Sequence, residues 1–84
     1  MSGAPSGRVV ELDLRGLLCP LPVIRVQDRV AELAPGDEVV AVCSDPGALN
    51  DIPAWCKING HFVLWKGERD GDYVVHLRVG GHRE

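Results

Sequence analysis

Residues 38–43, Glu-Val-Val-Ala-Val-Cys, constrain the fold more than any other stretch of the chain. A nearly continuous apolar run of this length predicts a strand at the centre of a sheet, buried on both faces or nearly so. Amphipathic helical patterns lie on both sides of it, at 20–33 and 46–59. Because parallel neighbouring strands need a crossover connection, which is usually a helix, this arrangement predicts an α/β chain.

Three further segments are predicted to be strands. Residues 8–14 alternate apolar and polar side chains, which is typical of a half-buried strand. Residues 61–68 and 73–79 form two more, and Asp70-Gly71 between them favours a hairpin. The predicted order is therefore β-α-β-α-β-β. With right-handed crossovers, both helices pack on one face of a four-stranded mixed sheet, which gives a two-layer α/β sandwich of the α+β type.

Size and charge limit the functions open to the chain. Its 84 residues predict one domain at 8–79, with a flexible N-terminal tail at 1–7 and a C-terminal tail at 80–84. A domain this small has one modest core and little room for a deep catalytic cavity. The net charge of −3 argues against direct nucleic-acid binding, and no apolar run reaches the roughly 18 residues that span a membrane. The N-terminus lacks the features of a signal peptide, so we expect a cytoplasmic protein.

The three cysteines are odd in number and widely spaced, which does not fit a disulfide framework. No Cys-x-x-Cys pair occurs and the histidines have no ligand spacing, so we expect no metal and no other cofactor. Cys43 ends the apolar strand and Cys56 lies in the apolar stripe of the second helix, which predicts that both pack in the core. Cys19 differs, because helix starts lie at the surface.

Cys19 stands directly before Pro20, and proline is favoured at the first position of a helix. We therefore expect Cys19 at or next to the N-cap, with Gly16, Pro20 and Pro22 shaping the turn. Free backbone N–H groups and the positive end of the helix dipole would then lower the pKa of the thiol.

The start of the second helix is less regular. Asp45 is predicted to cap it, with Pro46 at the first helical position. Pro53 leaves two alternatives, a loose first turn with the main helix starting near Asp51, or a helix that bends at Pro53.

A reactive thiol at a helix start is compatible with few chemistries. No histidine, His61 included, can be placed beside Cys19 as a base, and no resolving cysteine is near it in the sequence, which disfavours a hydrolase and a redox enzyme. Thiol exchange remains, in which Cys19 accepts a sulfur atom as a persulfide and passes it on. Two alternatives stay open: a non-catalytic regulatory or protein-interaction module, in which Cys19 only caps a helix, and an RNA-binding module, which rests on fold analogy.

Three basic residues lie on either side of Cys19 in the sequence. Residues 15–29 hold Arg15, Arg25 and Arg29 against one aspartate, a local charge of +2 in a chain of net charge −3. Arg25 and Arg29 are four residues apart and share a helix face. The three arginines predict a docking face for an acidic partner, and the alternative is an ordinary solvated helix face.

The run Leu-Asp-Leu-Arg-Gly-Leu-Leu-Cys-Pro-Leu-Pro at 12–22 resembles the signature of the TusA/SirA-like sulfur carriers. The mark of that family is Cys-Pro-x-Pro at the start of the first helix (the CPxP motif). Residues 44–56, which include Ser-Asp-Pro-Gly-Ala and Asp-Ile-Pro-Ala-Trp-Cys, are also similar, and so is Gly-His at 60–61. The resemblance covers residues 8–79. Leu21 takes the variable position of the motif, where some members carry an acidic residue, and is a further candidate for partner docking.

The resemblance implies the same β-α-β-α-β-β sandwich and a sulfur carrier with sulfurtransferase activity, in which Cys19 is the catalytic, persulfide-bearing residue. It implies a cysteine desulfurase or a rhodanese as sulfur donor, and a sulfur-relay or thiolation protein as acceptor. Members of the family serve tRNA thiolation, molybdenum-cofactor synthesis or sulfur oxidation. We expect a monomer, because a carrier must expose its thiol to two partners.

Overall fold

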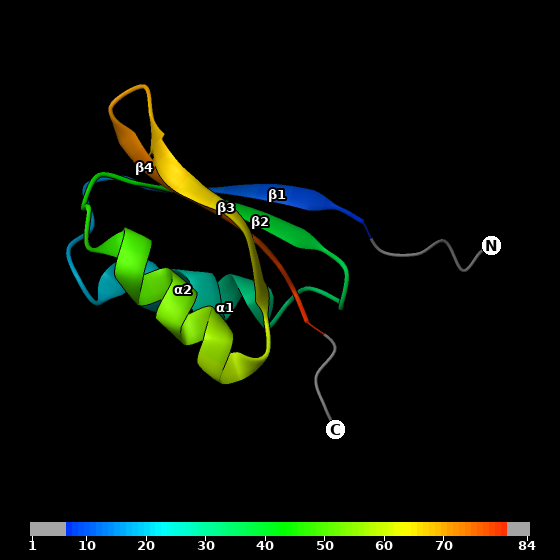
Figure 1. Cartoon of the computed structure of the whole chain (residues 1–84). Helices are drawn as coiled ribbons and strands as arrows, with labels where there is room; N and C mark the ends of the chain where they lie inside the picture. The colour runs from blue at the N-terminus through cyan, green and yellow to red at the C-terminus, as the bar shows by residue number, and fades with distance from the viewer. Residues whose placement is uncertain (1–6, 81–84) are drawn as a thin grey trace.

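The computed structural model describes residues 7–80, and its elements follow the predicted order β-α-β-α-β-β (Figure 1). They are β1 (Val9–Leu14), α1 (Leu21–Val30), β2 (Glu38–Cys43), α2 (Ala48–Asn59), β3 (Phe62–Arg69) and β4 (Asp72–Arg78). Apart from Gly7 and Gly80, the two tails predicted at 1–7 and 80–84 lie outside the described residues. No helix within residues 7–80 is long and apolar enough to cross a membrane.

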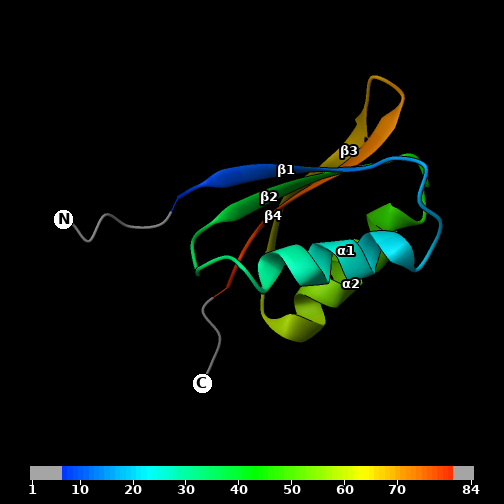
Figure 2. The ribbon, with the colours of Figure 1, turned by 180° about the vertical axis from the view of Figure 1, so that it is seen from behind.

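The four strands form one mixed sheet in the order β1-β2-β4-β3. β1 pairs with β2 in parallel, and the other two pairs are antiparallel. The run at 38–43 is β2, which lies between β1 and β4, so the prediction of a central strand is confirmed. Both helices cover the same face of the sheet, as Figure 2 shows from behind. The predicted two-layer fold is confirmed, and no helix of residues 7–80 covers the opposite face, which is called the open face below.

The core fills the space between the sheet and the two helices. The alternation predicted in β1 is observed, because Leu14 is buried, Val10 and Leu12 pack against the core, and the residues between them are exposed. The other strands and both helices supply the rest of the core, which includes Val26, Val39, Ala41, Cys43, Ile52, Cys56, Val75 and Leu77. Burial of this apolar surface is the main stabilising contribution to a fold of this size.

The first helix is shorter than its apolar pattern. Pro20 is the N-cap residue and not the first helical residue, so α1 begins one position later than predicted, and Pro22 lies in its first turn. The regular helix ends at Val30, three residues before the predicted Leu33. The backbone continues with bonds of the tighter i to i+3 type, such as Leu33 N to Val30 O at 2.9 Å, which often close a helix.

The second helix runs through Pro53 without interruption. Its N-cap is Gly47, so the prediction of Pro46 at the first helical position is wrong, and so is a main helix that starts only near Asp51. Because Pro53 has no N–H, the Leu49 carbonyl lacks its normal helical donor, and the Lys66 ammonium on β3 donates to it at 3.3 Å. A side chain from the sheet thus replaces the bond that proline removes.

A buried carboxylate fixes the end of the sheet where β1 begins. Asp37 is only 1% exposed, and its side chain accepts backbone N–H bonds from Gly7, Arg8 and Ala34. The Arg8 guanidinium lies 3.6 Å from it. The Ala34 bond is the largest cause that lowers the pKa of Asp37, so the group stays ionised although it is buried. Asp37 therefore joins the chain before β1 to the loop between α1 and β2.

Candidate functional site

The loop that carries Cys19 is held by the end of the neighbouring strand. β1 and β2 are parallel neighbours, so the loops that follow them lie at the same end of the molecule (Figure 1). The Gly16 N–H donates to Ser44 Oγ, directly after β2, at 2.8 Å. Gly16 has φ +85°, a conformation that favours glycine, as predicted for this turn. From this anchor the chain reaches an exposed Cys19 immediately before the N-cap of α1, as predicted.

The thiol of Cys19 is hydrogen-bonded to a carboxylate on the other helix. Cys19 Sγ donates to Asp51 Oδ2 at 3.2 Å, and Asp51 lies in the first turn of α2. This hydrogen bond is the largest cause that raises the pKa of the thiol, and desolvation and the charges of Asp51 and Asp45 act in the same direction. The prediction of a lowered pKa is therefore wrong.

The start of α1 offers few backbone N–H groups to the thiol. Pro20 and Pro22 have no N–H, so two of the first donors of α1 are missing. The Leu21 N–H is not free either, because it donates to Leu18 O at 2.8 Å. The prolines that set the turn thus reduce the number of backbone N–H groups that could stabilise a thiolate at Cys19.

Asp51 is the site residue that sequence reasoning missed. The sequence assigns Asp51 a possible helix start and a place in the family resemblance but no role at the thiol, although one signal points to it. Both helices follow parallel neighbouring strands, so their first turns lie at the same end of the sheet. A carboxylate in the first turn of α2 is then a natural neighbour of a thiol at the start of α1.

His61 lies away from this site. It follows the C-terminal end of α2, whereas Asp51 lies near the beginning of that helix. Its Nδ1 accepts the Gly80 N–H at 2.9 Å, and its ring stacks on Trp55 with the ring centroids 4.9 Å apart. Burial lowers the pKa of His61, which keeps the ring neutral. His61 therefore holds the backbone that follows β4 and does not serve Cys19 as a base.

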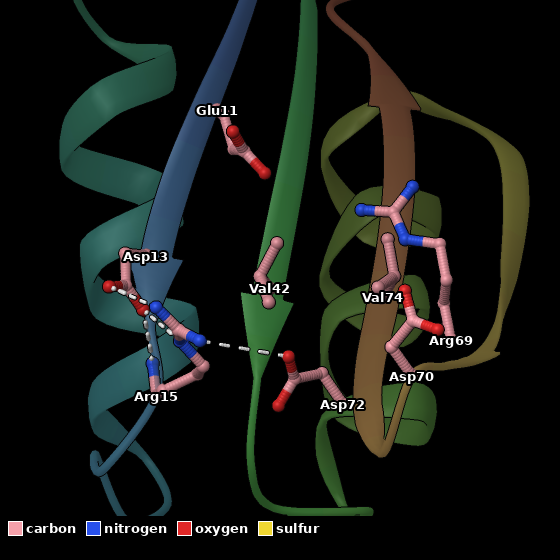
Figure 3. Close-up of a pocket in the computed structure, with 8 residues that line it drawn as sticks. All are labelled: Glu11, Asp13, Arg15, Val42, Arg69, Asp70, Asp72 and Val74. Carbon is pink, nitrogen blue, oxygen red and sulfur yellow. Dashed lines mark hydrogen bonds and ion pairs between the residues drawn. The ribbon is translucent and has the colours of Figure 1, made fainter.

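Arg15 points to the open face of the sheet and not towards the thiol. Its guanidinium contacts Asp13 at 2.8 Å and lies 3.8 Å from Asp72 (Figure 3). The three side chains line a shallow depression of about 320 Å³ together with Glu11, Val42, Arg69, Asp70 and Val74. Arg15 therefore lines a different depression from the other two arginines of the predicted docking face, although Asp13 lines both depressions.

Arg25 and Arg29 lie along α1, where they line a second depression of about 260 Å³ beside β1. The guanidinium of Arg29 is 2.6 Å from the Glu32 carboxylate, so part of the positive charge is compensated. Nearer to Cys19 the surface is apolar. Leu21 and Ile24 are exposed on one face of the helix, and Leu18 is 73% exposed. The sequence singled out Leu21 but neither of the other two.

Comparison with known proteins places this arrangement in a family. The family described as Sulfurtransferase TusA matches residues 10–79. The chain belongs to the TusA family. It is 37% identical over 67 residues to the sulfur carrier protein TusA of Pseudomonas aeruginosa, and this match covers 80% of this chain and 85% of that protein. It is 39% identical over 67 residues to the sulfur carrier protein TusA of Pseudomonas entomophila, with 80% and 84% covered.

A solved structure supports the same assignment. The crystal structure of a SirA-like protein from Desulfitobacterium hafniense matches with a TM-score of 0.76 and 27% identity, and the match covers 84% of this chain and 97% of that one. The resemblance to the TusA/SirA-like sulfur carriers is therefore confirmed, together with the fold that it implied.

The cysteines of this TusA-family chain differ sharply in environment. Cys43 is 0% exposed and Cys56 is 1% exposed, as predicted, and burial raises the pKa of each thiol to about 11. Cys19 is exposed at a helix start. Within the described part of the chain, no group of three or more side chains could hold a metal ion. The site therefore offers one accessible thiol, one carboxylate and an apolar surface around them.

Proposed function

We propose that the chain is a sulfur carrier with sulfurtransferase activity, which accepts sulfane sulfur as a persulfide on Cys19 and relays it to a partner protein. The observation that carries the proposal is the difference in exposure between Cys19 and the two buried cysteines. Membership of a family of sulfur carriers supports the class of activity.

The transfer itself is a thiol exchange. The Cys19 thiolate attacks the outer sulfur of a persulfide on the donor, a new S–S bond forms at Cys19, and the S–S bond of the donor breaks. The donor cysteine leaves as a thiolate and takes up the proton that Cys19 lost, so there is no net oxidation. This chemistry needs an exposed sulfur but no enclosed pocket, and neither depression described above includes Cys19.

The donor would be a cysteine desulfurase or a rhodanese, and the acceptor a sulfur-relay or thiolation protein. The apolar side chains of Leu18, Leu21 and Ile24 suit a partner that covers the thiol during transfer. Arg25 and Arg29 would steer acidic partners along α1, whereas Arg15 already contacts two carboxylates. We place the carrier domain at 8–79 and the protein in the cytoplasm, as a monomer, in tRNA thiolation, molybdenum-cofactor synthesis or sulfur oxidation.

The test is to load the protein with a cysteine desulfurase and cysteine and to measure its intact mass. The wild-type chain should gain the mass of one sulfur atom, and Cys19→Ser should gain none. Cys56→Ala is the matched control, because it removes a thiol that the solvent does not reach, and it should still load. Equal loading of wild type and Cys19→Ser would refute the assignment of Cys19.

One observation favours a second candidate, a non-catalytic interaction module. The thiol of Cys19 is held as a hydrogen-bond donor to Asp51, a role that a serine hydroxyl could also fill. In that case Cys19→Ser would keep full activity in the cell, whereas a sulfur carrier would lose it. The same variant therefore separates the two candidates.

A further inference from the structure

The contact between Cys19 and Asp51 suggests how the thiol is controlled. An ionised carboxylate only accepts hydrogen bonds, so Asp51 Oδ2 at 3.2 Å from Cys19 Sγ requires a protonated thiol. Cys19 lies in the loop immediately before α1, and Asp51 is half-buried in the first turn of α2, so the contact joins the starts of the two helices. The Asp51 carboxylate is therefore in a position to favour the protonated form of Cys19 over the thiolate.

The other charged groups near the thiol do not oppose this effect. Asp45, in the loop before α2, acts on Cys19 with the same sign as Asp51. Arg15, in the loop before Cys19, contacts Asp13 and Asp72. α1 carries no charged residue before Arg25, which lies beside β1. The unloaded thiol is thus exposed to solvent, and the two charged groups that act on it, Asp51 and Asp45, are both negative.

We propose that Asp51 is a positioning residue that holds the unloaded Cys19 as a protonated thiol and disfavours a persulfide anion in the same position. The second part rests on the proposed function. A persulfide anion has no proton to donate, so the carboxylate would repel it. The outer sulfur would then turn away from α2, towards Leu18 and Leu21, where a partner can reach it. The unloaded carrier would be protected from unwanted oxidation, because the thiolate is the reactive form.

The first part is tested without any sulfur transfer. The rate at which iodoacetamide alkylates the folded protein, measured against pH, gives the pKa of Cys19, because the other two thiols are buried. The wild-type midpoint should lie above the ordinary cysteine value of about 8.5, and Asp51→Asn should lower it. Each unit of decrease raises the thiolate fraction at neutral pH about tenfold. The rate rises by less, because a thiolate of lower pKa is a weaker nucleophile.

Asp28→Asn is the matched control, because it removes the same charge from an exposed position two turns along α1. It should leave the midpoint unchanged. Asp51→Ser, which is neutral but keeps a polar side chain, replaces Asp51→Asn if the latter does not fold. A wild-type midpoint at or below the ordinary value, or equal shifts in the Asp51 and Asp28 variants, would overturn the proposal. Neither result would bear on whether Cys19 carries sulfur.

The second part is tested at equilibrium with a small persulfide. In a buffer of glutathione persulfide and glutathione, Cys19 takes the outer sulfur and glutathione leaves as a thiol, so the ratio of loaded to unloaded protein reports their relative stability. Intact mass should show a severalfold higher ratio for Asp51→Asn than for wild type, and no change for Asp28→Asn. Equal ratios in all three proteins would show that Asp51 does not discriminate against the persulfide.

Discussion

The surface around Cys19 and the open face around Arg15 lie in different parts of the same small domain and have opposite properties. The first is exposed and largely apolar, with a single thiol beside a carboxylate. The second is a charged depression of about 320 Å³ that contains no cysteine or histidine (Figure 3). The open face therefore has the depression, whereas the nucleophilic thiol of Cys19 lies on the other surface. This separation suits a carrier whose sulfur enters the active sites of its partners.

The two regions also show what a carboxylate does to its neighbour. On the open face, the Arg15 side chain donates a hydrogen bond to Asp13, and this bond is the largest cause that lowers the pKa of Asp13 to about 2. Beside Cys19, Asp51 meets a group that becomes negative when it ionises, so it raises the pKa of the thiol. Aspartate is a stabilising partner in one place and a restraint on reactivity in the other.

The largest effect is expected in the core beneath the thiol. Ile52 follows Asp51 in α2 and is 0% exposed, so Ile52→Ala should lower the free energy of unfolding by about 2–5 kcal/mol. Ile58→Ala makes the same change on the same helix at a residue that is 82% exposed, and it should have little effect. Urea unfolding of both variants measures the difference. Equal losses would contradict the assignment of the core to this face.

A smaller, pH-dependent effect on thermal stability is expected when carboxylates with lowered pKa values are replaced. For such a group the stabilisation is complete above its unfolded pKa of about 3.9 and is lost as the pH falls through the folded pKa. Asp37 is buried with three backbone donors, whereas Asp13 is exposed, where an ion pair contributes little. Asp37→Asn should therefore lower the Tm at pH 7 more than Asp13→Asn does.

The same melting experiment carries its own check. As the pH is lowered from 7 to about 3, wild type loses the contribution that Asp37→Asn lacks at every pH, so the gap between their Tm values should narrow. A Tm difference that stays constant with pH would show that the charge of Asp37 does not cause the lower Tm of Asp37→Asn.

The smallest effect is expected on the rate of sulfur acceptance when arginines are replaced. It tests whether α1 or the open face is the docking surface. Arg25→Gln combined with Arg29→Gln should slow sulfur acceptance from an acidic donor a few-fold at low salt, because positive charge increases the rate of encounter. Arg15→Gln should change the rate less, because its guanidinium already contacts Asp13 and Asp72. Loading rates at low and high salt measure both. A larger effect of Arg15→Gln would place the docking face on the open side of the sheet.

Much of the architecture could be predicted from local patterns. The apolar run of β2, the alternation of β1 and the Asp-Gly turn before β4 each predict their element within a residue or so. The same patterns place Cys43 and Cys56 in the core and Cys19 at the surface. These properties follow from the period of side chains along a strand or helix, which a sequence shows directly.

The helix ends were predicted less well, because their caps depend on neighbours. α1 begins after Pro20 and not at it, and α2 begins at Ala48. α2 continues through Pro53, where Lys66 from β3 supplies the missing hydrogen bond to Leu49. No property of the helix sequence itself indicates that a lysine 17 residues away will do so.

The sequence by itself determined which elements form, in which order, and which cysteine is exposed. Only the tertiary structure decided the chemistry of that cysteine. Asp51 is 32 residues away from Cys19 in the chain and reaches it because two crossovers place both helix starts at one end of the sheet. A hydrogen bond at 3.2 Å between them reverses the pKa shift that the helix start predicts. Periodicity is a local property of the chain, whereas the electrostatic environment of a thiol depends on whatever the fold brings next to it.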